Sequence, residues 1–496
     1  MPSSFPTDLD PRTPVIVGAG VATQPVDEPG GGLEAIELML AATRAAAADA
    51  GADALLPAVE RIAVPGGNWA YSDPGRLVAE RIGAVGARTS LVQVGIPQQT
   101  LFDDAYLAIL AGTVDVALVV GGEAMRRATV ARRAGVEASE TAQTGVAPDE
   151  LQVPTGEIIT RIEIEGGIQS PMAPFAIIDS ALRAAEGRTI DEQRDEIARL
   201  YAGFSAVAAT NPHAAFPTVR DAAFLREPSE KNRPLAFPYN KWHCAQMNVD
   251  QAGAILICSL EAARRLGVDP ARIVFPHVAL ESSLSIPVSE REHIHRWPAM
   301  EVLGGAAEAH LGYALREIGP VELYSCFPAA VRVQQRALGL PTDGVPTITG
   351  GEAFAGGPWN NFVLQTTAAM VERVRTTPGE PGLVTTLSGL MNKPGLTVLS
   401  TEPGAKPLLV ADLAAPAAAV TGRLPVVAGY QGTATVAAYT VFFEGLDPVR
   451  TTAIADTPDG RRCIAACSAA ALAARVTHEE LVGAPITVDR TTFVAT

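Results

Sequence analysis

The sequence predicts a layered α/β protein with a separate small β-rich domain at its C-terminal end. Apolar, strand-like runs alternate with amphipathic, helix-like segments over residues 14–125, and a second series with the same order and spacing follows over residues 248–400. Such alternation is typical of parallel or mixed sheets that are covered by helices. Residues 425–496 instead carry several short β-prone runs separated by turn signals, which favours a small closed sheet.

The composition indicates a globular protein and argues against several classes of partner. Of the 496 residues, 48% are hydrophobic and only 19% are charged, so the chain can bury a large core. The net charge of −16 argues against binding to nucleic acid or to an anionic membrane. The apolar runs are shorter than the roughly 20 residues that a membrane helix needs. With no signal-peptide pattern and five scattered cysteines, we expect a cytoplasmic protein.

The first series consists of short β-prone runs that alternate with helical patterns. Pro97 suits the first turn of a helix, and apolar residues then recur at three- and four-residue spacing up to Ala111, which predicts a helix packed on a sheet. The predicted strands are Pro14–Val21, Arg61–Val64, Thr89–Val94 and Val114–Val120, and the predicted helices are Gly32–Ala50, a segment ending near Gly83, and Pro97–Ala111.

The second series repeats this order. The predicted strands are Asn248–Leu260, Arg272–Leu280, Val321–Tyr324, Gly382–Leu387 and Leu396–Ser400, and the predicted helices are Met300–Ile318, Pro328–Leu338 and Asn361–Thr376. Between the two series, residues 126–245 are mixed, with helices expected at Ile178–Glu186 and Ile190–Ala209. The segment Ala411–Gly422 is rich in alanine and proline and is interpreted as a linker.

The unit at Thr89–Met125, with its Gly-Gly-Glu-Ala-Met ending, resembles the core of the thiolase family. The resemblance covers about residues 13–405 and implies a duplicated five-layer αβαβα fold with a loop domain. The C-terminal addition is similar to that of the type-1 thiolase-like proteins, and its small sheet is expected to be closed, in the manner of an OB barrel. The implied divisions are residues 1–125 and 246–268 for the N-terminal half, 126–245 for the loop domain, 269–410 for the C-terminal half, and 423–496 for the added domain.

Four catalytic motifs of thiolases can be matched to this chain, and the expected side chains are missing or changed. The nucleophilic cysteine falls at Gly95 or, with a shift of one residue, at Ile96. The motif His-Asp-Cys-Phe of the sterol-carrier type matches Tyr324-Ser-Cys-Phe327, where Cys326 and Phe327 fit and Tyr324 replaces histidine. In the Gly-His-Pro motif, ending at Pro358, Gly357 stands at the histidine. In the Cys-x-Gly motif, ending at Gly389, Leu387 stands at the cysteine. Ordinary thiolysis is therefore not expected.

Some chemistry can survive these losses. In thiolases the backbone N–H groups of the nucleophile and of the last glycine form an oxyanion hole, and Gly95 and Gly389 can keep it because backbone donors need no side chain. Tyr324 lies where an acid or base is expected, and some thiolase-related aldolases use a tyrosine at this kind of position. A tyrosine can move a proton if its pKa is lowered; the alternative is a tyrosine with a packed ring and a hydrated hydroxyl.

Coenzyme A, free or as acyl-CoA, is the ligand that the resemblance implies. An acidic chain needs a local basic patch to bind such a polyanion. The candidate binding residues are Arg220, Lys231, Arg233 and Met247, in or next to the predicted loop domain. No metal is expected, since His293 and His295 lack a third ligand at a suitable spacing.

Three functional hypotheses follow. The first is a protein of acyl-CoA or lipid metabolism that binds coenzyme A or acyl-CoA without thiolysis. The second is an enzyme that makes or breaks a carbon–carbon bond beside a thioester without a covalent intermediate, with Tyr324 as acid or base. The third is a scaffold that docks a protein partner through residues 423–496. Thiolases dimerise through the strand that matches Thr89–Val94; the added domain is expected to block this contact, which favours a monomer.

Overall fold

The computed structural model describes residues 5–168 and 170–495, and its N-terminal half is built on a six-stranded sheet. The strand order is β1-β8-β4-β2-β3-β5, in which β1 and β8 and also β8 and β4 are antiparallel, while β4, β2, β3 and β5 run parallel. The strands are β1 (Pro14–Thr23), β2 (Arg61–Pro65), β3 (Arg88–Val92), β4 (Val116–Ala124), β5 (Glu150–Gln152) and β8 (Asp250–Ser259).

The C-terminal half repeats this topology in a five-stranded sheet of order β10-β11-β12-β9-β13. Strand β9 is antiparallel to β12, β12 is antiparallel to β11, and β11 is parallel to β10, which matches the relations of β1, β8, β4 and β2. The predicted duplication is therefore present in the fold. The strands are β9 (Phe275–Glu281), β10 (Val321–Glu322), β11 (Gly382–Ser388), β12 (Lys393–Ser400) and β13 (Leu409–Asp412).

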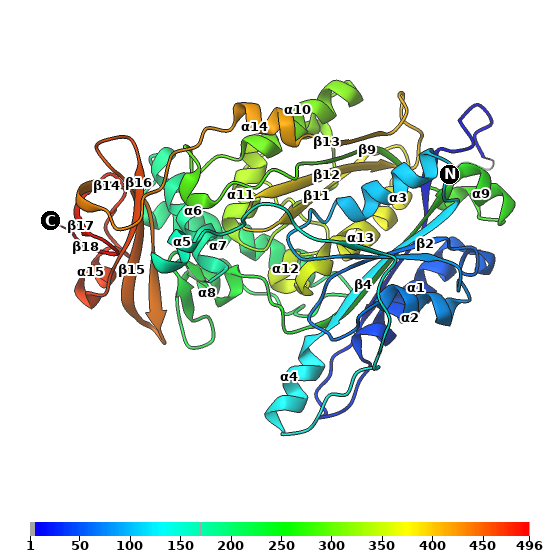
Figure 1. Cartoon of the computed structure of the whole chain (residues 1–496), viewed down its shortest axis with the longest axis horizontal. Helices are drawn as coiled ribbons and strands as arrows, with labels where there is room; N and C mark the ends of the chain where they lie inside the picture. Colours follow the sequence, from blue (N-terminus) through cyan, green and yellow to red (C-terminus); the bar gives the residue numbers. More distant parts are fainter. Residues whose placement is uncertain (1–4, 169, 496) are drawn as a thin grey trace.

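Helices separate and cover the two sheets, giving the five layers αβαβα (Figure 1). The middle layer is formed by α3 (Thr100–Leu110) and α13 (Phe362–Thr376), whose apolar residues pack between the two sheets in one buried cluster. The outer layer of the N-terminal half contains α1 (Ala35–Ala50), α2 (Pro74–Ile82) and α9 (Leu260–Arg265), and that of the C-terminal half contains α10 (Pro298–Leu311) and α11 (Pro328–Ala337).

The segment between β4 and β8 contributes helices over the C-terminal half and one strand to the N-terminal sheet. Strand β5 pairs in parallel with β3, with Leu91 opposite Leu151, and so covers the edge of that strand. The remaining elements are α4 (Met125–Arg133), α5 (Arg161–Glu165), α6 (Met172–Ala185), α7 (Ile190–Ala208), α8 (Ala222–Arg226) and the strands β6 (Pro234–Ala236) and β7 (Tyr239–Asn240).

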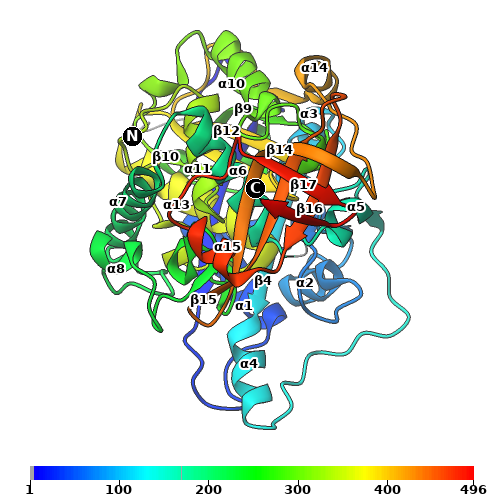
Figure 2. The ribbon, with the colours of Figure 1, turned by 90° about the vertical axis from the view of Figure 1, so that its left-hand side faces the viewer.

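The C-terminal region is a closed five-stranded sheet, which faces the viewer in Figure 2. Strand β15 pairs with β14 as well as with β16, which closes the circuit β14-β15-β16-β18-β17. Strand β14 also pairs with β6 through Phe442 and Ala236, so this barrel continues into the β6–β7 hairpin. Its elements are β14 (Gln431–Glu444), β15 (Asp447–Asp456), β16 (Arg462–Cys467), α15 (Ala470–Arg475), β17 (Pro485–Asp489) and β18 (Thr492–Ala495).

The interpretation of residues 411–422 as a linker is wrong. Residues up to Asp412 belong to β13, which lies parallel to β9, and Ala414–Val420 forms helix α14, whose Ala417 is buried. Alanine favours helix, and Pro416 is tolerated because it lies in the first turn of that helix. Across residues 5–168 and 170–495, none of the helices combines the length and apolar character needed to cross a bilayer.

Candidate functional site

A cavity of about 490 Å³ opens at the carboxyl ends of strands β3, β10 and β11. Its floor is formed by buried side chains of the loops that follow β10 and α12 (Gly351–Phe354), and its rim by exposed residues of the segment around the β6–β7 hairpin. Ligands of open α/β sheets bind outside the carboxyl ends of strands, so this is the position expected for a functional site.

Most of the residues singled out from the sequence line this one cavity. Those that line it are Gly95, Arg233, Met247, Tyr324, Cys326, Phe327, Gly357, Leu387 and Gly389. Arg220, Lys231 and Pro358 are not part of the lining, and the Arg220 guanidinium stacks 3.5 Å from the centre of the Trp242 ring instead. The fold therefore brings the four motif loops together at one place.

Gly95 and Gly389 face the same neighbour, Ile158. A Cβ atom on Gly95 would lie 2.9 Å from Ile158 Cδ1, and a Cβ on Gly389 would lie 3.2 Å from Ile158 Cγ2. Both glycines have positive φ angles, +102° and +70°. Within the described part of the chain, neither backbone N–H has a hydrogen-bond acceptor. Two unpaired N–H groups at one end of a cavity are donors for an oxyanion.

A buried lysine side chain holds the Gly95 loop in place. The buried Lys393 ammonium donates hydrogen bonds to the carbonyl oxygens of Gly95, at 2.8 Å, and Thr155, at 3.1 Å. Because Lys393 lies on β12, the Gly95 loop is tied to the sheet of the opposite half.

Tyr324 lies on the floor in a short polar chain. The Gln98 side-chain N–H₂ group donates to the Tyr324 hydroxyl and to the Asn360 side-chain oxygen, both at 3.1 Å. Burial raises the pKa of Tyr324 well above its usual value of 10, and the nearby Glu352 and Cys326 raise it further. The lowered pKa that a role as base requires is therefore not found; a neutral hydroxyl can still donate a hydrogen bond.

Two thiols, Cys244 and Cys326, line the cavity, but neither is activated. Burial raises the pKa of each thiol well above 9, and Glu352 raises that of Cys326 further. No histidine is found among the described residues that line the cavity. Because thiolate is the form that attacks a thioester, the surroundings of these two cysteines do not favour a nucleophilic role.

Glu352 is a floor residue that the sequence reasoning missed. Its carboxyl group lies beside Gly357, because a Cβ on Gly357 would be 3.4 Å from Glu352 Oε2. Oε1 accepts a hydrogen bond from the Ser325 N–H at 3.3 Å, and the Glu352 N–H donates to Ser325 Oγ at 3.1 Å. Burial raises the pKa of Glu352 to about 8. Glu352 lies outside the four motifs compared above; only its place in Gly350-Gly-Glu-Ala-Phe354, just before Gly357, offered a signal.

Positive charge gathers at the rim of the cavity. Arg233 is exposed and Lys241 is half-buried, and both line the cavity. Among the described residues, no carboxylate forms an ion pair with either of them, whereas Arg226 of the same segment contacts three: Asp191, Asp195 and Glu227. Burial lowers the pKa of Lys241, and the neighbouring charges of Arg233 and Arg220 lower it further.

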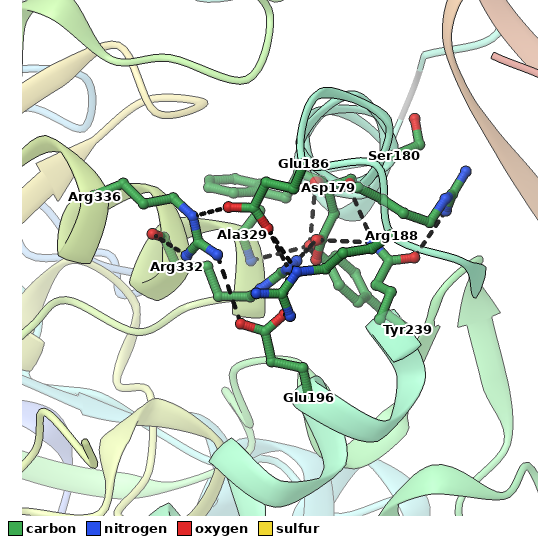
Figure 3. Close-up of polar contacts among 12 residues, drawn as sticks. Asp179, Ser180, Glu186, Arg188, Glu196, Tyr239, Ala329, Arg332 and Arg336 are labelled. Carbon is green, nitrogen blue, oxygen red and sulfur yellow. Dashed lines mark hydrogen bonds and ion pairs between the residues drawn. The ribbon is translucent and has the colours of Figure 1, made fainter. Parts of the chain in front are cut away.

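A buried polar network holds the floor from behind (Figure 3). Phe327 stacks on Phe175 of α6, with ring centres 4.5 Å apart. The Ala329 N–H donates to the Tyr239 hydroxyl at 3.1 Å, and that hydroxyl donates to Asp179 Oδ2 at 2.7 Å. Arg332 completes the network through ion pairs with Asp179 and Glu196. The floor is thus joined to helices α6 and α7.

Within residues 5–168 and 170–495, no group of three or more histidine, cysteine, aspartate or glutamate side chains is arranged to hold a metal ion.

Comparison with solved structures relates this fold to a set of known proteins. A monomeric SCP2-thiolase-like protein of type 1 from Mycobacterium smegmatis is 29% identical, with a TM-score of 0.83, over 98% of this chain and 100% of that one. This likeness therefore extends over the C-terminal barrel. No protein-family profile matches the chain, and no curated protein does.

Two further similarities are to the fold alone. An Ltp2-ChsH2(DUF35) aldolase is 19% identical, with a TM-score of 0.58, over 79% of this chain and 99% of that one. Human mitochondrial 3-ketoacyl-CoA thiolase, which has also been solved in complex with CoA, is 15% identical, with a TM-score of 0.57, over 80% of this chain and 100% of that one.

Proposed function

Because this chain belongs to the thiolase superfamily and resembles a type-1 SCP2-thiolase-like protein along nearly its whole length, we propose that it binds coenzyme A thioesters without running the thiolase reaction. The observation that carries the proposal is the composition of the cavity: two unpaired N–H groups at Gly95 and Gly389, and two cations without a carboxylate partner, Arg233 and Lys241, at the rim. The N–H groups suit a thioester oxygen, and the cations suit phosphates.

Thiolysis is excluded from this proposal by the chemistry of the floor. The reaction requires a thiolate, and the thiols of Cys244 and Cys326 both have a raised pKa. The protein should therefore hold a thioester without cleaving it by covalent transfer.

Titration calorimetry of the full chain with coenzyme A and acetyl-CoA tests binding. We expect saturable binding that weakens at least tenfold in the double variant Arg233→Ala, Lys241→Ala. Lys231→Ala removes an exposed cation of the same segment that does not line the cavity, so it should change the affinity less than twofold. Failure to bind coenzyme A or any acyl-CoA would contradict the proposal.

A second candidate function is carbon–carbon bond chemistry beside the thioester without a covalent intermediate. It is favoured by one observation: in the described part of the chain the Tyr324 O–H has no acceptor, although the hydroxyl lies at the floor and accepts from Gln98. We assign Tyr324 the role of hydrogen-bond donor to a substrate oxygen, because its pKa is raised. Turnover of β-hydroxyacyl-CoA or β-ketoacyl-CoA should fall in Tyr324→Phe, and an unchanged rate would refute this role.

A further inference from the structure

Glu352 is a carboxyl group on the floor of the cavity whose surroundings leave one oxygen available. Ser325 fixes Oε1 through its N–H, at 3.3 Å, and the Glu352 backbone is held in turn by Ser325 Oγ. For Oε2, the described residues supply no hydrogen-bond donor, and this oxygen lies beside Gly357, which also lines the cavity. The hydrogen bond to Oε1 thus fixes the orientation of the carboxyl group, and Oε2 is left without a hydrogen-bond partner among the described residues.

The place of this carboxyl group is informative. Gly357 stands where the thiolase resemblance implies a histidine side chain, and Glu352 Oε2 lies 3.4 Å from where the Cβ of such a side chain would begin. The space that the missing side chain leaves is therefore next to a different proton-carrying group, contributed by α12.

No positively charged group stabilises the ionised form of Glu352 among the groups that shift its pKa. The titratable groups that face Glu352 are carboxyl, phenol and thiol groups, which are neutral when protonated and negative when ionised. They are Glu322 of β10, Tyr324 and Cys326 of the next loop, and Tyr201 of α7. Burial raises the pKa of Glu352 to about 8, so both of its protonation states are accessible near neutral pH. A pKa close to the working pH suits proton transfer.

We propose that Glu352 is the catalytic base that removes a proton from the α-carbon of a bound acyl-CoA thioester; this rests on the proposed function above. In this step Oε2 forms an O–H bond with the α-proton as the C–H bond breaks. The C–H electron pair becomes the carbon–carbon double bond of an enolate, and the carbonyl π pair moves onto the thioester oxygen.

The reverse step returns a proton from Oε2 to the same carbon and restores the thioester. The enolate oxygen accepts hydrogen bonds from the N–H groups of Gly95 and Gly389, which have no other acceptor within the described residues. No bond to the protein forms, and no oxidant or further reactant is needed.

The test is deuterium exchange. The full chain is incubated with acetyl-CoA in D₂O, and uptake of deuterium into the acetyl group is followed by mass spectrometry between pH 6 and 10. The wild-type rate should rise with pH, reach half of its maximum near pH 8, and level off above that pH as the carboxyl group becomes fully ionised. Glu352→Gln should lower the rate by at least about 100-fold, as expected for loss of a general base, and its affinity for acetyl-CoA by calorimetry should stay within threefold.

Glu123→Gln is the matched control. Glu123 is also buried, with a pKa raised to about 7, but it does not line the cavity, so this variant should exchange at the wild-type rate. Exchange at the wild-type rate in Glu352→Gln, or acetyl-CoA binding by the wild type without any exchange, would overturn the role of Glu352 and leave the proposed function standing. Absence of acyl-CoA binding would overturn both.

Discussion

Arg332 of α11 and Asp179 of α6 form an ion pair in which neither side chain is exposed to solvent (Figure 3). Asp179 also accepts hydrogen bonds from the Tyr239 hydroxyl, at 2.7 Å, and the Gln193 side chain, at 2.9 Å. The pair joins α6 to α11 of the C-terminal half, and it is connected through the Tyr239 hydroxyl to the Ala329 N–H.

Removal of Asp179 should be costly, because the buried Arg332 then keeps only its more peripheral carboxylate partners, and the Tyr239 hydroxyl and the Gln193 side chain lose a buried acceptor. We expect Asp179→Ala to lower the free energy of unfolding by about 3–5 kcal/mol, measured by urea denaturation. Asp195→Ala is the control: Asp195 pairs with Arg226, and its side chain is 47% exposed, so the loss should be below about 1 kcal/mol. Equal losses would show that burial does not govern the contribution of these pairs.

Restoring a cysteine at Gly95 should not restore thiolysis. Gly95 has φ = +102°, and a Cβ there would lie 2.9 Å from Ile158 and 3.1 Å from Pro154. We expect Gly95→Cys to cost roughly 1–3 kcal/mol in stability from backbone strain, with further loss from crowding, and to release no acetyl-CoA from acetoacetyl-CoA and coenzyme A.

Gly51→Ala separates the two contributions to that cost. Gly51 also has a positive φ, +66°, but a Cβ there would have no neighbour within 4 Å. This variant should show a backbone cost without crowding, and it should melt at a higher temperature than Gly95→Cys. Thiolase activity in Gly95→Cys would show that the loop adapts and that the site needs only its lost nucleophile.

Strand β5 should keep the protein monomeric. It covers β3, the strand through which the family resemblance implies dimer formation, and it is clamped by side chains: Asp149 accepts from the Thr89 N–H at 2.8 Å and from Arg76 at 2.9 Å, and Arg61 contacts Glu150 at 2.9 Å. The sequence predicted that the added C-terminal domain blocks this contact; in the structure β5, from the segment between β4 and β8, covers the strand.

The double variant Asp149→Ala, Glu150→Ala should release β5 and expose the β3 edge, and free sheet edges favour self-association. Sedimentation velocity should then show a concentration-dependent increase in mass, whereas wild type should remain a monomer. Glu157→Ala, an exposed change in the same segment without an ion pair within the described residues, should behave as wild type. A monomeric double variant would mean that the side-chain clamps are not needed to hold β5.

Stability should fall as pH rises from about 4.5 to 8, in part because of Glu352. Burial raises the pKa of Glu352 from its ordinary 4.5 to about 8, so in this range the folded chain keeps a proton that the unfolded chain has lost. Proton loss therefore favours unfolding across that window. Denaturation at pH 5 and pH 8 should show a smaller fall for Glu352→Gln than for wild type; an identical fall would mean that the carboxyl group is ionised without penalty.

The sequence alone predicted much of the fold because the periodic signals were strong. The run Thr89–Val120 gave a strand, a turn at Gly95 and a buried helix, and the structure has β3, that turn and α3. Helix α3 begins at Thr100 and not at Pro97, because residues 97–99 form turns before it. The resemblance to thiolases implied that the four motif loops meet, and in the structure Gly95, Tyr324, Gly357 and Gly389 line one cavity.

The rest depends on tertiary contacts that local patterns do not encode. Three residues, Glu150–Gln152, form a strand only because the β3 edge is available. Glu352 is an ordinary glutamate in sequence, and its raised pKa arises from burial that the fold imposes. Lys241 stood in the polar and aromatic run Tyr239–Met247, but nothing in that run indicated which side chain faces the cavity.

The pairing of Phe442 with Ala236 attaches the β6–β7 hairpin to strand β14 of the C-terminal barrel. Arg233 directly precedes that hairpin and Lys241 directly follows it, so the barrel supports the segment that carries both cations. A chain truncated after residue 422 would lose the barrel and, with it, the strand pairing that supports this hairpin and its two cations. If such a truncated chain binds coenzyme A more weakly, displacement of the β6–β7 hairpin explains the loss. Weaker binding would therefore not show by itself that the barrel contacts the ligand.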